Sequence, residues 1–135
     1  MLEIQEKYSV LLESTSDMIM LVNEDYIIEY VNHVPEGKAR DETIGSSIYN
    51  YVQSDYRKLY RKFIDKVFKT GQSERIIVQA TGSKDSIAWY ETIITPFNIE
   101  GKIHKVILNI RDITSRKNIE DALKAAQDEM IHKDM

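Results

Sequence analysis

Few side chains in this chain of 135 residues have the type and spacing that chemistry requires. The three histidines, His33, His104 and His132, form no pair four residues apart that would bind a metal from one helix face. Cysteine is absent, which excludes a thiolate metal site, a disulfide and a cysteine nucleophile. The sequence also lacks a glycine-rich phosphate loop and a nucleophile elbow. We therefore predict that the chain itself is not an enzyme and that its histidines are ordinary surface or core residues.

The composition indicates a small folded domain, with 42% hydrophobic and 30% charged residues. Its net charge of −4 provides no electrostatic basis for binding nucleic acid. The basic residues between Arg57 and Lys69 are interleaved with apolar residues at helical spacing, which is typical of a solvated helix face. No apolar run approaches the roughly 18 residues of a transmembrane helix, and no signal peptide is recognisable. We expect a cytoplasmic protein without nucleic-acid binding or membrane insertion.

The strongest pattern lies in residues 89–114, where side chains alternate along two runs separated by a turn at Gly101. Because neighbouring side chains on a strand point to opposite faces, this alternation predicts two strands joined as a hairpin. Both runs carry apolar residues on each face, so the sheet must be covered on both sides. One face is expected to carry Tyr90, Thr92, Ile94, Val106, Leu108 and Ile110, and the other Trp89, Glu91, Ile93, Ile103 and Ile107.

The remaining segments predict an α+β domain. An amphipathic helix is expected in 2–13, a second hairpin from 18–22 and 26–31, a long helix in 53–70 ending before Gly71, and a further strand in 73–80. The result is a five-stranded antiparallel sheet with helices packed on one face. Past Thr114 a C-terminal helix repeats Ile119, Leu123, Ala126 and Met130 at coiled-coil spacing. A short surface helix is the alternative, since fewer than three heptads are present.

Short motifs in these segments carry a family resemblance. The order Trp89-Tyr90-Glu91, Thr95-Pro96, Gly101-Lys102-Ile103 and Arg111-Asp112-Ile113-Thr114 resembles the last two strands and the exit of a PAS sensor domain. Tyr30-Val31-Asn32 is similar to the end of the family's second strand, and Ile44-Gly45 to its mid-domain step. The resemblance covers about residues 8 to 118. It implies an amphipathic N-terminal helix (1–15), a PAS sensor domain (16–114) and a coiled-coil-like C-terminal signalling helix (115–135).

The resemblance also allows the cofactors of the family to be tested one by one. Its photoactive flavin class needs a thiol, and the matching position here is Ile48, which excludes a cysteine–flavin adduct. Its haem class takes a histidine from the long helix, and residues 53–70 contain none, so haem is not favoured. A non-covalently bound flavin or another small organic ligand remains open.

Strand phase, set by the resemblance, predicts one cavity between sheet and helices. Its lining would be Asn32, Phe63, Val67, Tyr90, Thr92, Ile94, Leu108 and Ile110. A mostly apolar lining with a few hydroxyl and amide groups is the usual make-up of a small-molecule site. The same residues also describe a filled hydrophobic core, and both interpretations stay open.

The sheet face that is turned away from the predicted cavity, together with the two terminal helices, indicates how the domain contacts other proteins. Trp89, Ile93, Ile103 and Ile107 would form an exposed apolar strip, which marks an interface or a covering helix. We expect a homodimer packed through Leu11, Trp89, Ile107, Ile119 and Leu123. In the family interpretation Asp112 and Thr114 couple the sheet to the exit helix. The function implied is a sensory domain that binds a small ligand or partner and relays a change to an output module such as the histidine kinase of a two-component system. The alternative is a ligand-free dimerisation and relay module.

Overall fold

A five-stranded antiparallel sheet forms the body of the protein in the computed structural model, which describes residues 10–11, 15–34, 39–81 and 87–133. The strands are β1 (Met18–Asn23), β2 (Ile28–Val31), β3 (Glu74–Thr81), β4 (Ile87–Ile99) and β5 (Lys102–Asp112). They are ordered β2-β1-β5-β4-β3, so the last strand of the chain lies in the middle of the sheet. The predicted α+β class and sheet are confirmed.

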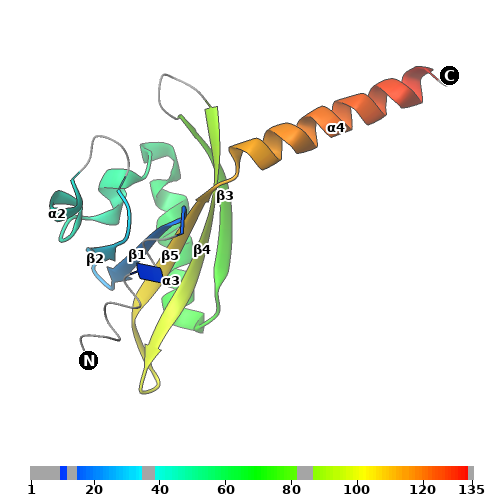
Figure 1. The fold of residues 1–135 in the computed structure, drawn as a ribbon. Helices are drawn as coiled ribbons and strands as arrows, with labels where there is room; N and C mark the ends of the chain where they lie inside the picture. The colour runs from blue at the N-terminus through cyan, green and yellow to red at the C-terminus, as the bar shows by residue number, and fades with distance from the viewer. Residues whose placement is uncertain (1–9, 12–14, 35–38, 82–86, 134–135) are drawn as a thin grey trace.

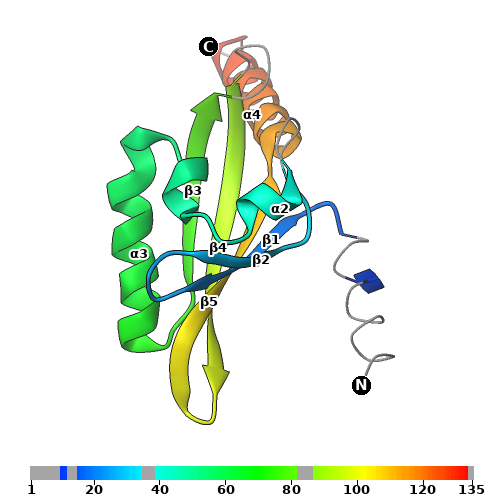
Figure 2. The ribbon, with the colours of Figure 1, turned by 90° about the vertical axis from the view of Figure 1, so that its left-hand side faces the viewer.

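Helices lie on one face of this sheet and beyond its end. They are α2 (Arg40–Thr43), the 3-10 turns η1 (Ile48–Tyr51) and η2 (Ser54–Tyr56), α3 (Arg57–Thr70) and α4 (Thr114–Lys133). Helix α3 lies along β3, β4 and β5, as Figure 2 shows, whereas α4 projects away from the sheet (Figure 1). The long helix begins at Arg57, four residues later than the predicted Gln53, and the 3-10 turn η2 precedes it.

The hydrophobic core fills the space between α3 and the sheet. Helix α3 contributes Tyr60, Ile64 and Val67, which recur at the helical spacing that places them on one face. The sheet contributes Met20, Val22, Ile76, Val78, Ile94, Val106 and Leu108. Gly71 ends α3 with φ of 71°, a left-handed conformation that glycine adopts without steric cost.

A bulge in the β4–β5 hairpin corrects one part of the predicted strand phase. Phe97 pairs with Lys105, but the next residue, Asn98, pairs with Ile103, so His104 is an extra residue in β5. One extra residue puts the side chains before it out of phase with those after it, so Ile103 faces the side opposite to the one that the alternation of residues 106–110 predicts. Ile103 therefore faces α3, and its Cδ1 lies 3.3 Å from where a Cβ on Gly71 would be. Its predicted place in the outer apolar strip was wrong.

The two ends of the chain are described to different extents. The predicted N-terminal helix, residues 1–15, lies outside the described residues except for Val10, Leu11 and Thr15. Val10 and Leu11 are helical and exposed. The predicted C-terminal helix is present as α4, and its residues 118–131 are all exposed.

Candidate functional site

All the predicted cavity residues except Asn32 gather between α3 and the sheet. Phe63 and Val67 come from α3, Tyr90, Thr92 and Ile94 from β4, and Leu108 and Ile110 from β5. Register brings them together, since Thr92 pairs with Ile110 and Ile94 with Leu108. Val67, Thr92, Ile94 and Leu108 have no solvent exposure, and the other three are half-buried. The predicted group is thus one packed layer.

One hydroxyl pair lies inside this layer. The hydroxyl groups of Tyr60 and Thr92 are hydrogen-bonded at 2.7 Å, and Tyr60 is only 5% exposed. Burial raises the pKa of Tyr60, and the bond to Thr92 offsets part of that rise. The sequence suggested Thr92 as a polar contact for a ligand and Tyr60 only as an aromatic ring, and it did not predict that their two hydroxyl groups meet. In the structure each hydroxyl already has a partner.

Asn32 has a different task from the rest of the predicted group. Its Oδ1 accepts hydrogen bonds from the amides of Ile19 and His33, both at 2.7 Å. Its Nδ2 donates to the carbonyl of Asp17 at 3.0 Å. The side chain therefore fastens the end of β2 to the start of β1. Asn32 directly follows β2, which ends at Val31 as the sequence predicts.

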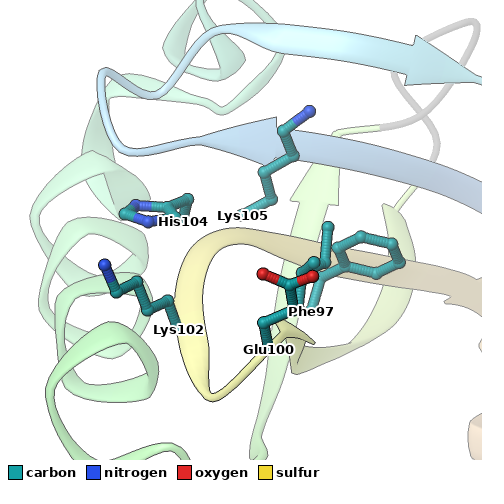
Figure 3. Close-up of a pocket in the computed structure, with 6 residues that line it drawn as sticks. Phe97, Glu100, Lys102, His104 and Lys105 are labelled. Atoms are coloured by element: carbon teal, nitrogen blue, oxygen red, sulfur yellow. The ribbon is translucent and has the colours of Figure 1, made fainter.

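A hollow of about 310 Å³ lies at the β4–β5 turn, away from the predicted interior (Figure 3). It is lined by Phe97, Ile99, Glu100, Lys102, His104 and Lys105. A hydrogen bond and an ion pair hold this turn against the β1–β2 hairpin: His104 Nδ1 lies 2.6 Å from Glu24 in the turn of that hairpin, and Lys105 Nζ lies 2.7 Å from Glu29 of β2. Figure 3 shows the Lys105 amine pointing toward those strands.

Tyr26 and Tyr49 form an aromatic pair beside α3. The Tyr26 hydroxyl donates to Asp65, and its ring lies 5.2 Å from that of Tyr49, centre to centre. The Tyr49 hydroxyl oxygen is buried and has no hydrogen-bond partner among the described residues. Burial raises the pKa of Tyr49 to about 12. This orphan hydroxyl is a local cost to stability.

The start of α4 is bonded directly to β4. The Ile113 amide donates to the carbonyl of Trp89 at 2.8 Å, and the Trp89 amide donates to Oγ1 of Thr114 at 2.9 Å. Asp112 Oδ1 accepts from the Thr114 amide at 2.9 Å and from the Thr114 hydroxyl. The predicted coupling residues, Asp112 and Thr114, therefore lie where the sheet becomes the exit helix. These bonds join β4 to the segment in which β5 passes into α4.

Charged groups interrupt the predicted apolar strip on the outer face, the face of the sheet opposite α3. Glu91 is only 8% exposed because Arg75 of β3 covers it, with Nε 2.7 Å from Oε2. Arg116 of α4 approaches the same oxygen at 3.8 Å. The Lys117 ammonium lies 5.0 Å from the centre of the Trp89 ring. The sequence contains the opposite charges of Arg75 and Glu91, but their pairing can be recognised only once the register of β3 against β4 is known.

The predicted packing residues lie on separate surfaces. Ile119 and Leu123 on α4 are 68% and 59% exposed, and Leu11 is 58% exposed. Trp89 and Ile107 are half-buried on the outer face. Among the described residues no group of His, Asp and Glu could hold a metal ion. Within the same residues no helix is long and apolar enough to cross a membrane.

Solved structures share this architecture. The PAS domain of a protein from Colwellia psychrerythraea gives a TM-score of 0.68 at 16% identity, covering 83% of this chain and 98% of that one. The PAS domain of an HTR-like protein from Haloarcula marismortui gives 0.61 at 20% identity, covering 84% and 100%. A sensory box sensor histidine kinase from Vibrio cholerae gives 0.59 at 20% identity, covering 84% and 94%. A comparison with curated proteins gives no significant match.

The sequence itself agrees with these structures. The family described as PAS fold matches residues 12–118, which contain all five strands, α2, α3 and the junction with α4. The match and the shared fold confirm the resemblance found in the motifs, and the chain belongs to the PAS-fold family.

Proposed function

We propose that this PAS domain is a sensory and relay module that passes a change in its sheet to α4, and through α4 to an output module. The observation that carries the proposal is the bonded junction of Trp89, Asp112 and Thr114. Beyond its first turn, α4 is exposed along its described length, so this junction sets the direction of the helix. The likeness to a sensor histidine kinase supports a two-component output in the cytoplasm.

The same two strands carry the interior layer and the junction. Thr92 and Ile94 face α3, and Trp89 on the same strand holds Thr114. An input that binds one arrangement of β4 and β5 better than another would shift the population of α4 orientations. The input is either a small molecule in the layer, such as a non-covalent flavin or another organic ligand, or a partner protein.

The packing of the interior favours the alternative, a relay without a ligand. The layer between α3 and the sheet contains residues with no exposure and a satisfied hydroxyl pair. A ligand placed in this layer would require its packed side chains to move apart. A partner that contacts the outer face or the termini would need no such opening.

We propose that the domain works as a homodimer held by α4 and the outer face. The exposed Ile119 and Leu123 on α4 and Ile93 on β4 support this arrangement. Lateral contact between two copies would place both α4 helices side by side, as a continuing two-helix output requires.

Native mass spectrometry of the purified chain, followed by denaturation and an absorbance scan, decides between the two inputs. A discrete bound mass that is lost in an Ile94→Phe variant, which fills the layer, would support a ligand. An apo protein whose melting temperature is unchanged by added flavins would support the ligand-free relay.

Hydrogen exchange tests the relay itself. Ile94→Val removes one methylene from the layer at a cost of about 0.5–1.5 kcal/mol. If the sheet and α4 are coupled, the amides of Ile113 and Lys117 exchange faster in this variant than in Ile76→Val, a matched deletion on the edge strand β3. Equal exchange in the two variants would reject the relay.

A further inference from the structure

A row of alternating charges crosses the outer face and joins the segment before β1 to α4. We call it the charge row; its members are Asp17, Arg111, Glu91, Arg75 and Arg116. At one end the guanidinium of Arg111 binds Asp17, with Nη2 3.0 Å from Oδ2 and Nε 3.2 Å from Oδ1. This paired geometry is the strong form of an arginine–carboxylate contact.

Arg111 lies between two carboxylates. It is the register partner of Glu91 on the neighbouring strand, and both side chains lie on the outer face. The hydrogen bond to Asp17 raises the pKa of Arg111, and the charge of Glu91 adds to the rise. The Arg111 side chain is 58% exposed, so solvent surrounds more than half of it. It is therefore able to turn from Asp17 toward Glu91.

Glu91 is shared unequally by the arginines around it. Arg75 bonds its Oε2 at 2.7 Å, whereas Arg116 of α4 approaches that oxygen at only 3.8 Å. Arg116 is thus the contact most easily displaced by a further cation. Its loss would weaken the attachment of the first turn of α4 to the sheet.

We propose that the charge row is a switch: when the segment before β1 withdraws Asp17, Arg111 turns to Glu91 and displaces Arg116, and α4 loosens from the sheet. An event in the chain before β1 would thereby reach α4 without passing through the interior layer. This inference deepens the proposed relay and rests on it, because it treats α4 as the output.

The single tryptophan is a natural reporter of this switch. Trp89 is the only tryptophan of the chain, and its ring lies under Lys117 in the first turn of α4. Loosening of α4 uncovers this ring. Quenching of Trp89 fluorescence by acrylamide therefore measures how firmly α4 is held.

The test compares Asp17→Asn, Arg111→Gln, the double variant and the wild type, each checked for folding by circular dichroism. In Asp17→Asn the population with a loosened α4 is expected to rise about two- to fivefold, as suits a partly exposed ion pair, and Trp89 quenching rises with it. The double variant is expected to return to the wild-type value, because Arg111 is no longer present to compete for Glu91. Arg111→Gln alone is expected to match the wild type.

Glu29→Gln is the matched control, because it removes a carboxylate that pairs with Lys105 at 2.7 Å on another part of the sheet. Its quenching should equal that of the wild type. Unchanged quenching in Asp17→Asn would overturn the switch, and so would an equal rise in Asp17→Asn and the double variant, which indicates simple loss of packing. Either result would reject the switch but not the proposed relay, which hydrogen exchange in Ile94→Val tests separately.

Discussion

At the scale of single residues, two tyrosine hydroxyls in this protein have opposite surroundings. The Tyr60 hydroxyl is buried and bonded to Thr92 at 2.7 Å. The Tyr49 hydroxyl is buried without a partner among the described residues. A buried hydroxyl stabilises the fold only if its bond replaces the one it loses to water. The first hydroxyl should therefore support the fold, and the second should weaken it.

The Tyr60–Thr92 bond predicts strong coupling between two substitutions. Tyr60→Phe and Thr92→Val should each lower the free energy of unfolding by about 1–3 kcal/mol, because each leaves a buried hydroxyl unpaired. The double variant should cost less than the sum, since it removes both hydroxyl groups. Urea denaturation of the four proteins measures the coupling. Additive costs would show that the two hydroxyls do not depend on each other.

Tyr49 predicts a loss of stability in alkaline solution. Its pKa is about 12 in the folded state, against 10.0 for an unperturbed tyrosine. The Tyr49 hydroxyl therefore ionises first in the unfolded state. Its ionisation leaves the free energy of unfolding unchanged below pH 10 and lowers it as the pH rises toward 12. Tyr49→Phe should reduce that fall and raise stability at neutral pH. Part of the pH dependence of stability should remain in this variant, because burial also raises the pKa of Tyr26, Tyr60 and Tyr90. A pH series of thermal melts measures both effects, and an identical slope in the variant would contradict the assignment.

At the scale of elements, the end of α3 and the β4–β5 hairpin fit together. Gly71 ends α3 in the left-handed region, and the bulge at His104 turns Ile103 toward it. The extra residue in β5 therefore brings an apolar side chain under the end of the helix. This contact supports α3 where the core residues of the helix end.

Alanine substitutions at Gly71 and Gly101 distinguish the cost of backbone strain from the cost of a steric contact. Both have positive φ, 71° and 81°, so alanine at either position should cost about 1–2 kcal/mol. Only Gly71 has a neighbour within 4 Å of the added Cβ, namely Ile103 at 3.3 Å. Gly71→Ala should thus destabilise the protein more than Gly101→Ala, and Ile103→Val should remove most of the difference. Equal unfolding free energies for the two alanine variants would show that Ile103 does not crowd the site.

At the scale of the whole molecule, α4 leaves the body and presents apolar side chains to solvent. Ile119, Leu123 and Met130 are 68%, 59% and 66% exposed. The helix has 20 described residues, fewer than three full heptads. In the proposed homodimer the outer face, with Ile93 38% exposed, would add contact area to that of α4.

If the proposed homodimer forms, Leu123→Lys should convert it to a monomer, because this substitution places a charge in the apolar seam of α4. Asn118→Lys adds the same charge to the same helix away from that seam and should leave the dimer intact. Sedimentation velocity of the three proteins measures the change. A monomeric wild type, or a Leu123→Lys variant that remains dimeric, would reject the seam as the dimer contact.

The sequence alone determined the five strands, the long helix and the exit helix. Alternation in residues 90–94 and 106–110 grouped Thr92, Ile94 and Leu108 on one face, the family resemblance indicated that this face is turned to the interior, and the structure buries it together with Val67 of the long helix. These predictions succeeded because burial leaves a period of two along a strand and about 3.6 along a helix. The family followed from motifs of the same local kind.

The tertiary structure alone decided the contacts between distant segments. The bulge that turns Ile103, the pairing of Tyr60 with Thr92, and the charge row from Asp17 to Arg116 depend on register and on helix placement. Asp17 and Arg111 are 94 residues apart, and nothing in the local pattern of either residue records the other. Periodicity reports which side of an element is buried, whereas a side-chain contact requires the relative position of two elements, which only folding establishes.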